Sequence, residues 1–133
     1  MRRWYRWWVT GIQLKIKYPH LQVVLIEVNT KKISFLNEVI KQLALDNIEV
    51  CPLDWRTFLR KTEYSIDVFC SRASLQTDEL FRVFSPAYHY NTAVLVYWAS
   101  VQRKTQEVDL VYLKKEEEYK VGNKTRKLMF FSK

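Results

Sequence analysis

An apolar run followed by a helical pattern is the sequence feature that most limits the fold. Residues 21–28 read LQVVLIEV, a nearly unbroken series of aliphatic and β-branched side chains that is typical of a central strand. Ser34 follows as an expected N-cap, and apolar side chains then recur at helical spacing as far as Asp46 and Asn47. The connection between the two is short, so the helix should cover one face of the sheet that contains the strand.

A second long stretch lacks glycine altogether. Residues 50–69 read VCPLDWRTFLRKTEYSIDVF, and within them residues 64–68 alternate apolar and polar side chains, as a half-exposed strand does. Pro52 suits a strand edge or a bulge, because it cannot donate to a central ladder. A further strand is expected in YHYNTAVLVYW. Residues 48–69 and 88–98 are therefore predicted to form the two arms of a protruding hairpin.

The last third of the chain is open to two interpretations. Ser100 can cap a helix through residues 101–118, whose end is rich in Glu and Lys. Residues 107–113 (EVDLVYL), however, also alternate and have high strand propensity. The length of the segment and the need for a second helix over the sheet favour the helix. After it, Gly122 and Asn123 predict a turn, and RKLMFF predicts a closing strand.

The resulting order is β-α-β-β-α-β. It predicts an α+β, ferredoxin-like fold: a four-stranded antiparallel sheet with two helices on one face and a long hairpin over about residues 48–98. The chain of 133 residues suits one such domain at residues 21–133, after a basic, Trp-rich extension at residues 1–20. Apolar residues make up 48% of the chain, which excludes global disorder, and no apolar run is long enough to span a membrane.

Positive charge is concentrated at the two ends of the chain. The net charge is +8, yet residues 1–20 and residues 120–133 contain only basic charges, while the middle is nearly neutral. Basic ends around a neutral body suit an extended polyanion such as nucleic acid. A bias towards solubility would produce the same distribution.

The chain begins MRRWYRWWVTG. On a helix, Trp4, Trp7 and Trp8 would share one face, with arginines between them. Three interpretations are open: docking on nucleic acid or on protein, attachment to a membrane surface, and local core packing. The segment has neither the apolar core of a secretory signal nor the serines of a transit peptide, so we do not expect a cleaved leader.

No catalytic set is evident in the sequence. Gly11 and Gly122 are the only glycines, too few for the loops that hold phosphates, so we set aside nucleotide-binding folds of the glycine-rich kind. His20 and His89 lie far apart and have no recognisable carboxylate partner, which favours surface or packing roles.

Metal and thiol chemistry are not expected either. Cys51 and Cys70 form no CxxC pair, which indicates a reducing compartment and argues against zinc, and nothing marks either thiol as a nucleophile. On one extended strand they would also lie too far apart to pair. Adjacent acids at residues 78–79 and 116–118 suit a solvated face. We therefore predict no metal and no cofactor.

Several short patterns in residues 21–131 have the order and spacing of one known family. The chain resembles small-subunit ribosomal protein ten (the S-ten family) in a divergent organellar form. The residues that carry this resemblance are Val50, Pro52, Arg60, Lys61, Tyr64, Thr105, Val108, Leu113 and the segment GNKTRKLMFF. The proline and histidine that the family has after the position of Ser71 are missing, which puts the RNA contacts of the hairpin tip in doubt.

The resemblance implies a non-enzymatic structural constituent of the mitochondrial small ribosomal subunit, in the matrix. It would bind small-subunit rRNA and neighbouring head proteins, which for this family are proteins three, nine and fourteen, with no small-molecule substrate. The expected rRNA contacts are Arg56, Arg60, Lys61, Arg72 and Arg82 on the hairpin and Arg2, Arg3, Arg6, Lys124, Arg126 and Lys127 at the ends. Trp4, Trp7, Trp8 and Trp55 would dock on RNA or protein.

Two other classes of function remain open. One is an accessory subunit of an organellar membrane complex, anchored by the Arg/Trp-rich start, although a membrane partner is the less favoured reading. The other is a small enzyme on the same fold, for which the sequence offers no nameable catalytic group.

Overall fold

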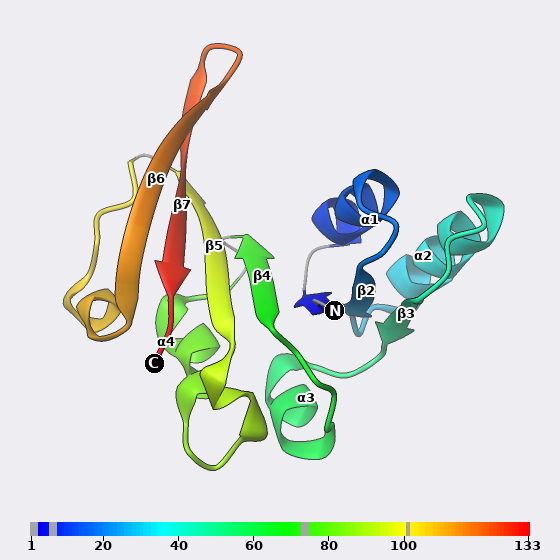
Figure 1. Ribbon diagram of the computed structural model, residues 1–133, viewed down its shortest axis with the longest axis horizontal. Coiled ribbons are helices and arrows are strands. Elements are labelled where there is room, and N and C mark those ends of the chain that lie inside the picture. Colours follow the sequence, from blue (N-terminus) through cyan, green and yellow to red (C-terminus); the bar gives the residue numbers. More distant parts are fainter. Residues whose placement is uncertain (1–2, 6–7, 73–74, 101) are drawn as a thin grey trace.

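A mixed sheet forms the centre of the fold (Figure 1). The computed structural model describes residues 3–5, 8–72, 75–100 and 102–133. Within them the sheet has seven strands in the order β3-β2-β1-β4-β5-β7-β6. The strands are β1 (Arg3–Tyr5), β2 (Gln22–Ile26), β3 (Ile48–Cys51), β4 (Val68–Arg72), β5 (Val94–Ser100), β6 (Leu113–Val121) and β7 (Lys124–Phe131).

Strands β1 to β5 are parallel, and β7 runs antiparallel between β5 and β6. The connecting helices are α1 (Trp8–Lys17), α2 (Thr30–Gln42), α3 (Trp55–Lys61) and α4 (Thr77–Leu80), with 3-10 turns η1 (Phe81–Phe84), η2 (His89–Thr92) and η3 (Glu107–Val111). The predicted ferredoxin-like sheet is therefore wrong. The observed arrangement is a doubly wound α/β fold, in which helical crossovers join parallel strands.

Helices cover both faces of the sheet. On one face, Val23 and Leu25 of β2 pack with Ile12 of α1 and Leu36 of α2. On the other, strand residues such as Ile26 pack with the buried side chains of α3, α4 and η1. Burial on both faces requires apolar residues at successive positions of β2, which explains the unbroken run in the sequence.

A third apolar cluster consists of strand residues alone. Val68 and Cys70 of β4 pack with Val96 of β5, and partly buried residues of β5 and β7 surround them, among them Trp98 and Phe130. Among the described residues, no helix contributes to this cluster. In the described part of the chain, helices thus cover the first face of the sheet over β2, and no helix packs on the apolar cluster of β4, β5 and β7.

The strand and helix predicted near the start of the chain are confirmed, with a different helix start. Helix α2 begins at Thr30, because the Asn29 side chain, and not that of Ser34, caps it. The Asn29 Oδ1 accepts a hydrogen bond of 3.0 Å from the backbone N–H of Lys32. Side-chain capping of this kind satisfies one of the N–H groups that the first turn leaves open.

The predicted hairpin over residues 48–98 does not form. Helix α3 separates β3 from β4, and Asp54 caps it by accepting a 2.8 Å hydrogen bond from the Thr57 N–H. The spacing of Trp55, Phe58 and Leu59 places all three in the core. Residues 50–69 are therefore a strand, a crossover helix and the start of the next strand, and not one long arm.

The long hairpin of this protein lies elsewhere. The helix predicted for residues 101–118 is wrong, because the described part of this segment contains η3 and most of β6. The alternative of a strand over residues 107–113 is also wrong except at its last residue, since η3 occupies Glu107–Val111 and β6 begins at Leu113. Gly122 makes the predicted turn with a φ of 60°, and β7 follows. Figure 1 shows the β6–β7 hairpin projecting beyond the rest of the sheet.

Residues assigned by sequence to an N-terminal extension form α1. The buried Lys15 side chain donates hydrogen bonds to the carbonyl oxygens of Pro19, at 2.6 Å, and Leu21, at 2.5 Å. This ties the end of α1 to the start of β2. The domain boundary at residue 20 itself stays a prediction.

Gly11 lets α1 lie close against β2. A Cβ at this position would stand 2.5 Å from the Cδ2 of Leu25. We expect Gly11→Ala to lower the free energy of unfolding by about 1 kcal/mol, because overpacking costs roughly 1–3 kcal/mol and better helix propensity returns part of it. Urea unfolding measures this, with the exposed Gln13→Ala as control. An unchanged midpoint would mean that Leu25 moves aside at little cost.

Candidate functional site

The strand order identifies where this fold binds ligands. In doubly wound sheets, ligands lie beyond the carboxyl ends of the strands, where the order reverses. Here the reversal falls at β1, which pairs with both β2 and β4. A hollow of about 310 Å³ lies at this edge, beyond the ends of β2 and β3. Its lining residues are Ile26, Glu27, Val28, Leu53, Asp54, Trp55, Arg56, Leu75 and Glu79.

Glu27 is the acid that the strands place at this hollow. It directly follows β2. Its backbone N–H donates a hydrogen bond to the Cys51 carbonyl at 3.1 Å, which fixes the backbone position from which the side chain extends. Its side chain is 17% exposed, and the carboxylate lies 3.9 Å from the ammonium group of Lys32. A carboxylate can accept several hydrogen bonds, so this group suits a ligand that carries neighbouring hydroxyls.

A second acid at the hollow is already neutralised. Glu79 of α4 accepts two hydrogen bonds from Arg56, at 2.6 and 3.0 Å, and one from Arg82 at 3.1 Å. The bonds from Arg56 lower the pKa of Glu79 to about 2. The Trp55 indole N–H also donates to the Glu79 carbonyl at 3.0 Å. These contacts hold α3 against α4 and leave Glu27 as the better acceptor for a ligand.

Apolar side chains complete the walls. Val28, Leu53 and Leu75 line the hollow beside Glu27. A flat, uncharged ring can lie against such walls while hydroxyls on the same molecule reach the carboxylate. The combination fits a nucleoside.

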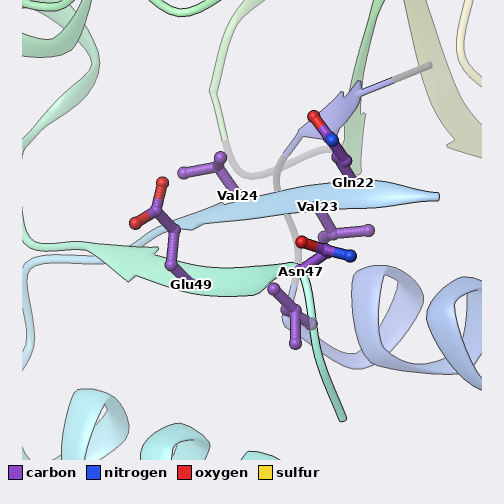
Figure 2. Close-up of a pocket in the computed structure, with 6 residues that line it drawn as sticks. Gln22, Val23, Val24, Asn47 and Glu49 are labelled. Atoms are coloured by element: carbon purple, nitrogen blue, oxygen red, sulfur yellow. The ribbon is translucent and has the colours of Figure 1, made fainter. Parts of the chain in front are cut away.

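Another hollow, of about 290 Å³, lies near the amino ends of β2 and β3. Figure 2 shows the Glu49 carboxylate on the same side of these strands as Val24, and Gln22 and Asn47 also line the hollow. This is the opposite edge of the sheet from the one that binds ligands in such folds. Glu49 therefore provides a useful comparison for Glu27.

The structure separates the predicted rRNA-binding residues. Arg56 and Arg82 both hold Glu79, Arg60 and Lys61 are exposed in the last turn of α3, and Arg72 ends β4. They do not line one arm, since the predicted hairpin is absent. Their role as RNA contacts stays a prediction.

The residues predicted at the chain ends also differ in their placement. Lys124 and Arg126 are exposed on β7, whereas Lys127 is buried and donates to the Arg103 carbonyl at 2.8 Å. Trp55 packs in the core and not on a docking surface. Arg3 and Trp4 belong to β1 and Trp8 begins α1, while Arg2, Arg6 and Trp7 lie outside the described residues.

The cysteines and histidines give no catalytic set. Cys51 and Cys70 belong to different strands, β3 and β4, and both are buried thiols that form no disulfide. Burial raises the pKa of Cys51, which disfavours the reactive thiolate. His20 and His89 are exposed, and His89 contacts the Tyr64 carbonyl at 2.8 Å. The described part of the chain contains no cluster of three or more His, Cys, Asp or Glu side chains suited to a metal.

A family model matches most of the chain, at residues 9–129: GidB, described as rRNA small subunit methyltransferase G. The chain is 40% identical over 78 residues to ribosomal RNA small subunit methyltransferase G of Lachnoclostridium phytofermentans, which is 57% of this chain and 32% of the relative. With the Malacoplasma penetrans protein of the same name it shares 30% over 83 residues, or 62% and 35%. The chain thus spans about a third of these curated relatives.

Solved methyltransferases share the fold. M. capricolum TrmK, solved with S-adenosylhomocysteine, superposes with a TM-score of 0.69 at 12% identity, over 99% of this chain and 62% of that one. At this identity the likeness concerns the fold alone. It agrees with the doubly wound sheet and again contradicts a ferredoxin-like one.

These matches overturn the resemblance to ribosomal protein ten. The family model covers nearly the whole stretch on which that resemblance rested, so the predicted role as a structural constituent of the ribosomal subunit is wrong, as is the alternative of a membrane-complex subunit. No helix in the described ranges is long and apolar enough to cross a membrane.

The expectation of a non-enzymatic protein is also contradicted, because the relatives are named as methyltransferases. The methyl transfer for which these relatives are named requires a methyl donor, which contradicts the expectation of no small-molecule substrate. The family match extends over both walls of the hollow, from Glu27 to Glu79. The chain belongs to the GidB family, rRNA small subunit methyltransferase G.

Proposed function

We propose that this chain is the cofactor-binding part of a methyltransferase that transfers a methyl group from S-adenosylmethionine to small-subunit rRNA. The observation that carries the proposal is the Glu27 carboxylate at the apolar hollow beyond β2, at the edge where the strand order reverses. The names of the relatives supply the reaction class and the rRNA substrate.

The residues present fit the nucleoside part of this cofactor. Glu27 would accept hydrogen bonds from the ribose hydroxyls, as an acid does at the end of a strand in dinucleotide-binding folds. Val28, Leu53 and Leu75 would shield the base from water. When bound, the cofactor supplies an electrophilic methyl group on a positively charged sulfur. The side chains described above bind and orient it.

Calorimetric titration and methyl transfer test the proposal. We expect S-adenosylhomocysteine to bind more tightly than adenosine, and tritiated S-adenosylmethionine to label small-subunit rRNA. If S-adenosylhomocysteine neither releases nor absorbs heat with the folded chain, or if no label is transferred to the rRNA, the proposal is wrong.

The rRNA partner belongs to the proposal on the strength of the family. The named neighbouring head proteins rested on the ribosomal resemblance and have no remaining support. The mitochondrial location stays a prediction.

A further inference from the structure

The face of the sheet that carries the apolar cluster of β4, β5 and β7 has a hollow of its own. It measures about 340 Å³ and is formed by the carboxyl ends of β4 and β5 together with the outer part of the β6–β7 hairpin. Its lining residues are Arg72, Trp98, Ala99, Ser100, Tyr119, Val121, Lys124 and Arg126. Three of these are basic and none is acidic.

Strand register explains why these side chains meet. Arg72 of β4 pairs with Trp98 of β5, and two residues further along β5, Ser100 pairs with Arg126 of β7, which in turn pairs with Tyr119 of β6. Residues two apart on a strand point to the same face. The basic and aromatic groups therefore lie on neighbouring rows of one surface.

Strand alternation also sorts the charges of the hairpin. Glu116 is on the far side, where it accepts a hydrogen bond of 3.0 Å from Thr105. Glu117 shares the face of Tyr119, but its carboxylate pairs with Lys115 at 2.5 Å. The glutamate run of β6 thus leaves the hollow with a positive balance from Arg72, Lys124 and Arg126.

We propose that this hollow, the β6–β7 groove, binds a single-stranded segment of the RNA substrate. The indole of Trp98 and the phenol ring of Tyr119 are both half-buried, so each is held in place and still offers a surface on which a base can stack. Lys124 and Arg126 lie beside them and contact phosphates.

A single strand suits this groove better than other polyanions do. An acidic peptide would use the cations and leave the rings without partners, whereas a duplex keeps its bases stacked inside. The groove and the Glu27 hollow both lie at the carboxyl ends of strands, and Arg72 ends the strand next to the reversal point. An RNA strand in the groove is thereby brought to the edge where the cofactor is proposed to lie. The inference rests in this respect on the proposed function.

The test uses fluorescence anisotropy with a labelled single-stranded RNA of ten nucleotides. Lys124→Glu/Arg126→Glu should weaken binding more than tenfold and reduce the slope of log affinity against log salt by about 1.4, since each lost contact to a single strand removes about 0.7. Lys31→Glu/Lys41→Glu, on α2, makes the same change in net charge and serves as the matched control. An equal loss of RNA affinity in both double variants would overturn the proposal.

A second pair of variants tests stacking. Tyr119→Ala should weaken binding by about 5- to 150-fold, the range for one lost base stack, while Tyr119→Phe retains the ring and should bind as the wild type does. An acidic decapeptide that displaces the RNA and is insensitive to Tyr119→Ala would identify a general polyanion site and overturn the RNA assignment.

Titration with S-adenosylhomocysteine separates the two proposals. Lys124→Glu/Arg126→Glu and Tyr119→Ala should both bind S-adenosylhomocysteine with wild-type affinity. If the wild type does not bind this ligand but these variants still bind RNA more weakly than the wild type, the cofactor proposal is wrong and the proposal of an RNA-binding groove is supported. Unchanged RNA affinity in Lys124→Glu/Arg126→Glu overturns the groove whatever the cofactor result.

Discussion

Asp109→Ala is expected to destabilise the chain by about 3–5 kcal/mol, the cost of removing one partner from a buried charge pair. Asp109 is fully buried, and its carboxylate accepts hydrogen bonds from Thr77 at 2.6 Å, from Arg103 at 2.8 Å and from the Gln106 N–H at 2.8 Å. Arg103, whose side chain is only 16% exposed, would lose its counter-charge. The network joins α4 to the segment before β6, so its loss loosens the packing of both.

Thermal unfolding measures this effect. For a chain of this size the melting temperature should fall by roughly 10 °C or more. Asp67→Ala, at an exposed position, is the control and should leave the melting temperature nearly unchanged. A shift of less than 2–3 °C, roughly what 1 kcal/mol produces, would show that Arg103 finds another partner or reaches water.

The same carboxylate gives stability a pH dependence. Burial raises the pKa of Asp109, but the hydrogen bonds from Arg103, Thr77 and Gln106 lower it by more than burial raises it. The pKa of Asp109 is therefore below its usual value of 3.8. A folded-state pKa below the unfolded one adds stability that is complete above the unfolded value and is lost as the pH falls through the folded value. The difference in unfolding free energy between wild type and Asp109→Asn should therefore be constant above about pH 5 and shrink below pH 4.

Local signals in the sequence predicted those elements that local chemistry determines. Strand β2, helix α2, the turn at Gly122 and most of β7 were expected at or near their observed positions. Each has a strong periodic pattern or a residue with a special backbone conformation. The predicted start of α2 was five residues too late, because Asn29 and Ser34 are both good N-caps and only the structure shows which one is used.

The sheet topology was missed because the choice between parallel and antiparallel pairing rests on contacts distant in sequence. One signal was present: an apolar run without alternation indicates a strand buried on both faces, which is typical of parallel sheets. A second was Asp54, a good N-cap, followed by Trp55, Phe58 and Leu59 at helical spacing. These two signals together predict α3 and a crossover within residues 50–69, and they should have outweighed the length of that segment, which suggested a hairpin.

The candidate site was missed for a related reason. The sequence has too few glycines for a glycine-rich loop. We took this scarcity as evidence against a nucleotide-binding fold as well, and that inference was wrong. Packing of α1 and α2 on β2 maintains the fold, and Gly11 alone provides the close approach of α1. The signal for the site was Glu27, an acid directly after a buried strand. It identifies a ligand site only once the strand order is known, because only then does β2 lie beside the point where the order reverses.

Glu27→Gln should reduce the affinity for S-adenosylhomocysteine by about 10- to 100-fold. A hydrogen bond to a charged acceptor contributes roughly 1.5–3 kcal/mol, and the amide that replaces the carboxylate accepts at only one of its two ends. The fold should be unaffected, because the contact of Glu27 with the exposed Lys32 at 3.9 Å is a surface ion pair that contributes little. Calorimetry measures the affinity, and the melting temperature confirms the fold.

Glu49→Gln is the matched control for this change. It makes the same substitution on the neighbouring strand, β3, in the hollow at the opposite edge of the sheet (Figure 2). We expect it to leave the affinity for S-adenosylhomocysteine unchanged. If Glu49→Gln weakens binding and Glu27→Gln does not, the ligand lies at the amino ends of the strands, and the site proposed from the strand order is wrong. Only a loss confined to Glu27→Gln supports a nucleoside held beyond the carboxyl end of β2.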